Sequence, residues 1–146
     1  MVKKIIGILG SPLLEGNTAF LLDRALQGAR DAGCDVEKIF VANLDFQACN
    51  EMMFCKEHET CIMDDDMQLM YQKFRETDGI ILATPNYINQ VTAALKAVLD
   101  RSSHFIHCKR LLGKYICGVV TPGSGAHTDS GTSCRRTAMP PVSVEP

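Results

Sequence analysis

The chain has 146 residues, a formal net charge of −2 and an apolar fraction of 46%, which suits one domain with a sizeable core. No apolar run approaches the ~18 residues that a membrane-spanning helix needs, and a pI near 6.1 gives no basic surface for nucleic acid or an anionic membrane. Because no secretion signal is recognisable, we expect a cytoplasmic protein.

The first third of the chain predicts a strand, a helix and a second strand. An apolar run over residues 3–9 predicts a buried strand. Apolar side chains at helical spacing over residues 18–32 predict a helix, with Asn17 as its N-cap and Gly33 at its end. The β-branched content of residues 36–41 predicts the second strand. The apolar face expected of the helix comprises Leu21, Leu22, Ala25, Leu26 and Ala29.

The alternation continues after a loop rich in Cys and Met. Asp65, with Gln68 three residues later, forms a capping-box pattern at the start of a second helix. Residues 80–83 form a short continuous apolar run, which is typical of the middle of a parallel sheet. A third helix is predicted over residues 91–102 and a fourth strand over residues 115–120. The side chains expected in the core are Met67, Met70, Tyr71 and Phe74 from the second helix, and Ala94, Leu95, Val98 and Leu99 from the third.

Strands and helices that alternate with short connections predict an α/β fold with a doubly wound parallel sheet. Three polar, Gly- and Pro-containing loops follow the first, third and fourth strands, at residues 10–18, 84–87 and 121–125. Ligands of such sheets bind beyond the carboxyl ends of the strands, so the three loops are expected to lie together. The first loop leads into a helix N-terminus, where unpaired N–H groups and the helix dipole favour a phosphate. Together the loops favour a flavin.

The chain resembles the flavodoxin-like NADPH-dependent FMN reductases, and most closely the branch of the iron–sulfur flavoproteins, in three ordered segments: residues 10–18, 83–87 and 94–101. The resemblance runs from about Val2 to Thr128. It implies that the first loop wraps the FMN phosphate, that the second follows the edge of the isoalloxazine ring, and that the third closes over the pyrimidine side of the ring. The cofactor-binding residues implied in this way are Ser11, Gly16, Asn17, Thr18, Pro85, Asn86, Tyr87, Ile88, Thr121 and Gly123.

The same resemblance implies an FMN-dependent oxidoreductase that takes a hydride from NAD(P)H and passes electrons to a flavin, quinone or similar small acceptor. No catalytic side-chain acid or base is required, because N5 of the flavin accepts the hydride. Family members commonly form dimers or larger homo-oligomers, so at least a homodimer is expected. Two alternatives stay open: an electron-transfer flavoprotein that exchanges electrons with protein partners, and a degenerate remnant that no longer holds flavin.

Three of the seven cysteines, Cys49, Cys55 and Cys61, lie in the loop after the second strand. Without a secretion signal, such a count favours thiols, a metal site or a cluster over disulfides. Iron–sulfur flavoproteins carry four cysteines in this loop, and Met52 stands where the second is expected. Because a four-iron cluster normally takes four thiolates, the sequence argues against a cluster. Three interpretations remain: a cluster-free loop, a metal or cluster completed by His58 or an outside ligand, and redox-active thiols.

Two histidines, His104 and His107, follow the third helix. We interpret them as a solvated helix end, where cationic His interacts well with the helix dipole. A metal site involving Cys108 is the alternative.

The end of the chain departs from the family pattern. Related proteins continue with a further helix and strand, whereas residues 129–146 are polar and rich in Pro. We therefore expect a flavodoxin-like FMN-binding domain over residues 1–128, truncated relative to longer reductases and lacking the last helix and strand. Residues 129–146 are expected to form a disordered tail, which would leave the fourth strand as an uncovered edge.

Overall fold

The computed structural model of the chain describes residues 1–122 and 133–136. Strands and helices alternate along it. The strands are β1 (Lys4–Leu9), β2 (Asp35–Phe40), β3 (Gly79–Pro85), β4 (Tyr115–Thr121) and β5 (Ser133–Arg136). The helices are α1 (Asn17–Asp31), α2 (Phe54–His58), α3 (Met67–Glu76), α4 (Ala93–Arg101) and α5 (Ser103–His107), and η1 (Val41–Asn43) is a single 3-10 turn.

The strands form one sheet in the order β2-β1-β3-β4-β5. β1 pairs in parallel with β2 and β3, and β3 pairs in parallel with β4, so the predicted doubly wound, flavodoxin-like fold is confirmed. β5 pairs antiparallel with β4, and the expectation of an uncovered β4 edge was therefore wrong. No fifth parallel strand occurs among the described residues. The division into a domain over 1–128 and a tail over 129–146 stays a prediction.

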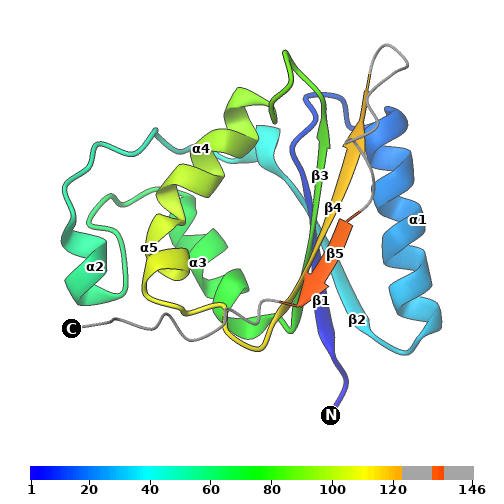
Figure 1. The fold of residues 1–146 in the computed structure, drawn as a ribbon, viewed down its shortest axis with the longest axis horizontal. Coiled ribbons are helices and arrows are strands. Elements are labelled where there is room, and N and C mark those ends of the chain that lie inside the picture. Colours follow the sequence, from blue (N-terminus) through cyan, green and yellow to red (C-terminus); the bar gives the residue numbers. More distant parts are fainter. Residues whose placement is uncertain (123–132, 137–146) are drawn as a thin grey trace, which may run out of the picture.

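Helices cover both faces of the sheet, as Figure 1 shows: α1 lies on one face, and α3, α4 and α5 lie on the other. Each face has its own apolar core, which explains why β1 and β3 are apolar on both sides. The α1 core comprises Leu9, Ala19, Leu22, Leu26, Ile81, Ala83 and Val119. The core under α3–α5 includes Ile6, Ile8, Met67, Met70, Tyr71, Phe74, Ile80, Leu95, Val98 and Phe105.

The first helix begins one residue earlier than predicted. Gly16 is its N-cap and Asn17 its first helical residue, so the assignment of Asn17 as the N-cap was wrong. Gly33, at a φ of 83° just beyond the last turn, is confirmed as the residue that ends it. The buried face of the helix differs from the predicted apolar face at its first turn, because the start of the helix packs on the carboxyl end of the sheet. Thr18 and Ala19 are buried there, whereas Leu21 is 44% exposed.

The second helix has the predicted apolar stripe but no capping box. The carboxylate of Asp65 does accept a hydrogen bond from the N–H of Met67, at 3.2 Å. The side chain of Gln68 instead points back along the chain and donates to the carbonyl oxygens of Cys61 and Met63, both at 2.8 Å. Gln68 thus satisfies backbone groups of the preceding loop rather than those of its own helix.

The predicted third helix is confirmed as α4, and α5, which follows it after Ser102, was not predicted. Leu95 and Val98 are buried as expected, but Ala94 is exposed because it faces the loops at the edge of the sheet.

The longest helix, α1, has only 15 residues. In the described part of the chain, no helix combines the length and apolar character needed to cross a membrane. The cytoplasmic location stays a prediction.

Candidate functional site

The loops after β1 and β3 lie beside the end of β4 at the carboxyl edge of the sheet, at the top of Figure 1. Of the predicted third loop, the structure describes only Thr121 and Pro122. The first is tied to β3, since the N–H of Gly10 donates to the carbonyl oxygen of Ala83 at 2.7 Å. The second is tied to the end of β4, since the N–H of Asn86 donates to the carbonyl oxygen of Thr121 at 2.9 Å. The hydroxyl oxygens of Thr18 and Thr121 lie 2.6 Å apart, which joins the start of α1 to the same point.

The first loop and the start of α1 form a seat suited to an anion. Ser11 is buried, with 5% of the residue exposed. Its hydroxyl oxygen accepts a hydrogen bond from the N–H of Leu13 at 3.1 Å, which leaves the hydroxyl proton free to be donated. Gly16 provides no side-chain cap for α1. The N–H groups of the first helical turn, from Asn17 onward, therefore face the loop without a partner within the helix.

Gly10 serves packing rather than ligand binding. A Cβ at this position would lie 2.8 Å from Cβ of Leu95 in α4 and 3.2 Å from the carbonyl oxygen of Ala83. Because both atoms are fixed to the backbone, only glycine lets the first loop approach α4 so closely.

The second loop is a tight turn whose tip projects into solvent. The N–H of Tyr87 donates to the carbonyl oxygen of Gln90 at 2.9 Å, and the N–H of Gln90 donates to the carbonyl oxygen of Tyr87 at 3.0 Å. Ile88 and Asn89, between them, have positive φ angles of 51° and 59°, which non-glycine residues adopt rarely. Tyr87 is 51% and Ile88 97% exposed.

A cleft of about 240 Å³ lies between the first two loops, near the lower end of the range of about 300–1,000 Å³ usual for small-molecule sites. Of the predicted site residues, Ser11 and Tyr87 line this cleft directly. Its other lining residues are Gly10, Pro12, Ala42, Thr92, Ala93 and Ala94.

The remaining predicted residues surround the cleft or lie beyond it. Thr18, Asn86 and Thr121 take part in the hydrogen bonds described above. Ile88 is 97% exposed and is not among the residues that line the cleft. Gly123 lies outside the described residues. Gly16 and Asn17 stand at the start of α1, and Pro85 ends β3. Sequence reasoning missed Thr92, although a Thr directly before a helical pattern is a recognised N-cap signal.

A buried ion pair anchors the Cys- and Met-rich segment over residues 44–66, which we call the cysteine loop. Arg101, with 1% of its side chain exposed, makes two parallel hydrogen bonds to the carboxylate of Asp65, at 2.7 and 2.9 Å. Both groups also hold the backbone of Gln47: Arg101 donates to its carbonyl oxygen at 2.8 Å, and Asp65 accepts from its N–H at 3.2 Å. Burial by itself would raise the pKa of Asp65, but the hydrogen bonds from Arg101 and the backbone lower that pKa below its usual value.

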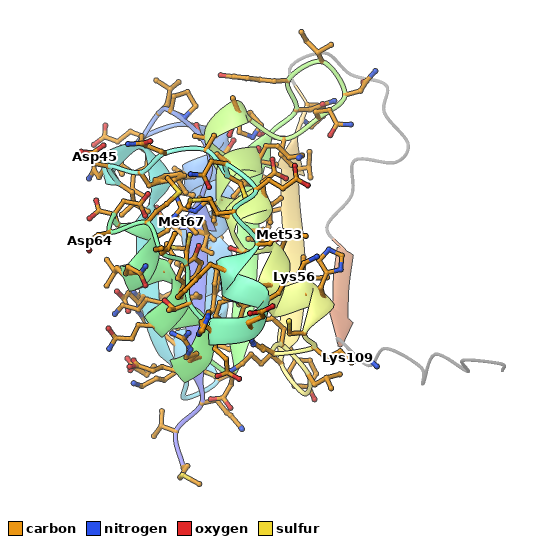
Figure 2. The ribbon with its side chains drawn as sticks, turned by 90° about the vertical axis from the view of Figure 1, so that its left-hand side faces the viewer. Asp45, Met53, Lys56, Asp64, Met67 and Lys109 are labelled. Carbon is orange, nitrogen blue, oxygen red and sulfur yellow. The ribbon has the colours of Figure 1, made fainter. Side chains whose placement is uncertain are left out.

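Figure 2 looks onto the cysteine loop from outside. Met53 and Lys56 lie toward the viewer, in front of the layer that contains α4 and α5, and Asp45 and Asp64 lie at its margin. Arg101 was missed by sequence reasoning, since a charged residue near a helix end gives no sign that it is buried.

His104 is buried, not solvated, so the interpretation of His104 as part of a solvated helix end was wrong; His107 is exposed. Nδ1 of His104 is hydrogen-bonded to Arg110, and because a guanidinium only donates, the ring proton resides on Nε2. That N–H is buried without a partner among the described residues. Burial, together with the positive charges of Arg110 and Arg75, lowers the pKa of His104 to about 4. The ring is therefore neutral near neutral pH.

The cysteine loop carries free thiols. Burial, reinforced by the nearby Cys61, raises the pKa of the Cys55 thiol. Met52, in the place of the second cluster cysteine, is 59% exposed, and no three His, Cys, Asp or Glu side chains of the described residues are arranged to hold a metal ion. The four-thiolate cluster implied by the iron–sulfur branch does not fit the described residues.

The fold is that of a flavodoxin-like α/β protein, with a cleft at the carboxyl edge of its sheet. Residues 3–139 match the profile of a family described as NADPH-dependent FMN reductase. The chain belongs to the NADPH-dependent FMN reductase family.

Relatives from two branches of this family are similar to the chain. An iron–sulfur flavoprotein of Methanosarcina thermophila is 38% identical over 99 residues, which cover 68% of this chain and 52% of the relative. An FMN reductase (NADPH) of Pseudomonas putida is 28% identical, over 84% of this chain and 56% of the relative. The chain spans about half the length of the curated relatives that it matches.

Solved structures with the same fold include an NADH:FMN oxidoreductase in its apo form. It is 27% identical, with a TM-score of 0.60, and the match covers 88% of this chain and 63% of that one. A quinone reductase from Klebsiella pneumoniae, described as putative, has a TM-score of 0.66 at 16% identity, over 85% of this chain and 61% of that one. The latter likeness concerns the fold alone.

Proposed function

We propose that the cleft binds FMN and that the protein is an oxidoreductase which takes a hydride from NAD(P)H and passes electrons to a flavin, quinone or similar small acceptor. The observation that carries the proposal is that hydrogen bonds join the loops after β1 and β3 and the start of α1 to the end of β4, at one edge of the sheet. Family membership supports FMN as the ligand.

The phosphate of FMN would be held without a cationic side chain. Residues 10–18 contain no Lys or Arg, so the donors are neutral: the hydroxyls of Ser11 and Thr18, the side-chain amide of Asn17, and the N–H groups from Gly16 into the first turn of α1. A helix N-terminus of this kind favours an anion through its N–H groups and its dipole.

The ring would lie against the second loop. The N–H groups of Asn86 and Tyr87 are engaged by Thr121 and Gln90, and within the described chain no hydrogen bond occupies those of Ile88 and Asn89. These two are the donors that the loop can offer to the edge of the ring, beside Pro85. Bound FMN supplies hydride acceptance, and the protein supplies position and hydrogen bonds. We assign Thr121 and Gly123 to the pyrimidine side.

The exposed rim of the cleft favours a homodimer. Tyr87 and Ile88 present apolar surface beside the site, and burial of such surface stabilises association. A second subunit that covers this rim would shield the ring from water.

The proposal is tested with the purified protein, by titration with FMN and with riboflavin, which lacks the phosphate. FMN is expected to bind more tightly than riboflavin, and Asn17→Ala is expected to reduce that difference. Gln27→Ala, on an exposed part of the same helix, is the matched control and should leave both affinities unchanged. A protein that binds neither flavin would refute the proposal.

Anaerobic addition of NADPH or NADH to the FMN complex tests the reaction. Rapid loss of the flavin absorbance supports the reductase. Reduction by a protein donor alone would favour the electron-transfer flavoprotein, and an iron assay on the same sample tests for a cluster directly.

A further inference from the structure

We propose that Thr92 is a positioning residue that fixes the first loop (residues 10–18) and the second loop (residues 84–87) relative to each other, so that its hydroxyl controls FMN affinity without donating a hydrogen bond to FMN. This inference rests on the proposed FMN site and adds a residue that the resemblance does not supply.

The side chain of Thr92 is buried, with the residue 4% exposed. Its hydroxyl donates to the carbonyl oxygen of Gly10 at 2.6 Å and accepts from the N–H of Leu95 at 3.3 Å, the usual hydrogen bond of a helix N-cap. One hydroxyl proton serves one acceptor, so Gly10 takes that proton and none remains for a ligand.

Thr92 closes a circuit of hydrogen bonds around the floor of the cleft. Its own N–H donates to the hydroxyl of Thr84 at 3.2 Å, at the end of β3. The N–H of Gly10 donates to Ala83, the neighbour of Thr84, at 2.7 Å. The first loop is thus held to β3 through the N–H of Gly10. The C=O of Gly10 holds it to Thr92, whose own N–H is bonded to Thr84 at the start of the second loop.

Removal of the hydroxyl would open this circuit at a buried point. Thr92→Val keeps the shape of the side chain but leaves the carbonyl of Gly10 and the N–H of Leu95 without their partner, in a place where groups of this kind are costly to leave unpaired. Thr92→Ser keeps both hydrogen bonds and removes only a methyl group.

Thr77 provides a matched control at the opposite edge of the sheet. It is 2% exposed, and its hydroxyl oxygen lies 2.9 and 2.8 Å from the carbonyl oxygens of Lys4 and Gly79, so that its one proton can be donated to either of them. Like Thr92, it bridges β1 to the segment around β3, but it lies at the amino end of β3, away from the cleft.

The experiment measures FMN dissociation constants and the visible circular dichroism of bound FMN for the full chain and these variants. Thr92→Val is expected to weaken FMN binding about tenfold and to change the dichroism at saturating FMN. Thr92→Ser is expected to stay within about twofold of the parent protein. Thr77→Val is expected to lower the melting temperature but to leave both flavin measurements unchanged. If Thr92 acted only through overall stability, the two valine variants would change the flavin measurements alike.

If Thr92→Val folds and binds FMN like the parent protein, with the same dichroism, the inference is wrong while the proposed function stands. If the parent protein itself fails to bind FMN, both are wrong. Should Thr92→Val not fold, Thr92→Ala removes the same hydroxyl with a smaller side chain, and an unchanged affinity and dichroism in that variant refute the inference equally.

Discussion

Replacement of Asp65 by Ala tests the buried ion pair most directly. The change leaves the guanidinium of Arg101 in a site where 1% of its side chain is exposed, and it removes the acceptor of two hydrogen bonds at 2.7 and 2.9 Å. Loss of one partner of a buried pair costs about 3–5 kcal/mol. Because 13% of the Asp65 side chain is exposed, we expect the lower end of that range, about 3 kcal/mol.

Such a loss is large against a total stability of about 5–15 kcal/mol for a typical domain. For a chain of this size it corresponds to a fall in melting temperature of about 6–12 °C. The control is Asp64→Ala, which removes an exposed neighbouring carboxylate and should change stability by less than about 0.5 kcal/mol. The double replacement Asp65→Leu with Arg101→Met removes both charges together and should cost less than Asp65→Ala alone.

Urea unfolding followed by circular dichroism measures the global effect, and trypsin measures the local one. Lys56 is the only Lys or Arg between residues 44 and 66, and it lies in the outward-facing part of the cysteine loop (Figure 2). Because Asp65 and Arg101 both hold Gln47, their separation should free the loop and speed cleavage after Lys56. Equal stability and equal cleavage in Asp65→Ala and Asp64→Ala would refute the reasoning.

Two further predictions concern the same layers of the fold. Burial and the charges of Arg110 and Arg75 hold the pKa of His104 at about 4, below its ordinary 6.5, so the unfolded chain binds more protons than the folded one between these pH values. Stability therefore falls as the pH is lowered: urea unfolding should show a loss of about 2 kcal/mol from about pH 7 to about pH 5, and His104→Gln should remove this contribution. Gly10→Ala should destabilise by about 1–3 kcal/mol, since the new Cβ would lie 2.8 Å from Cβ of Leu95, and should lower FMN affinity. Gly28→Ala meets no atom within 4 Å in the middle of α1 and should raise stability by about 0.5–1 kcal/mol; equal melting temperatures for the two glycine variants would contradict the packing role of Gly10.

The elements of the fold could be predicted because each carries a periodic signal of its own. The apolar runs of β1 and β3 and the stripe of α3 are dictated by two-sided or one-sided burial, and burial is what the periodicity reports. The meeting of the loops after β1 and β3 beside the end of β4 followed from the topology, since parallel strands place the loops after them at one edge.

The interactions that join distant segments could not be predicted in the same way. Nothing near Arg101 in sequence indicates that its partner is Asp65, 36 residues earlier, or that Gln68 faces the cysteine loop rather than its own helix. The burial of His104 likewise depends on Arg110 and on the ring of Tyr71 beside it. Periodicity reports which face of an element is covered, but not which side chain completes a contact across the fold.

The central position of β1 has a consequence for how the chain acquires its structure during synthesis. All six of its residues pair with β2 on one side, and five of them, Ile5–Leu9, pair on the other side with β3, which comes much later in the chain at Gly79–Pro85. A nascent chain that has emerged only to Phe40 can form the first of these ladders, but the other edge of β1 stays open until β3 leaves the ribosome. Contacts between segments so far apart along the chain form slowly, and an unpaired apolar strand edge invites aggregation. The interval between β2 and β3, occupied largely by the cysteine loop and α3, is therefore when a chaperone would protect this protein most.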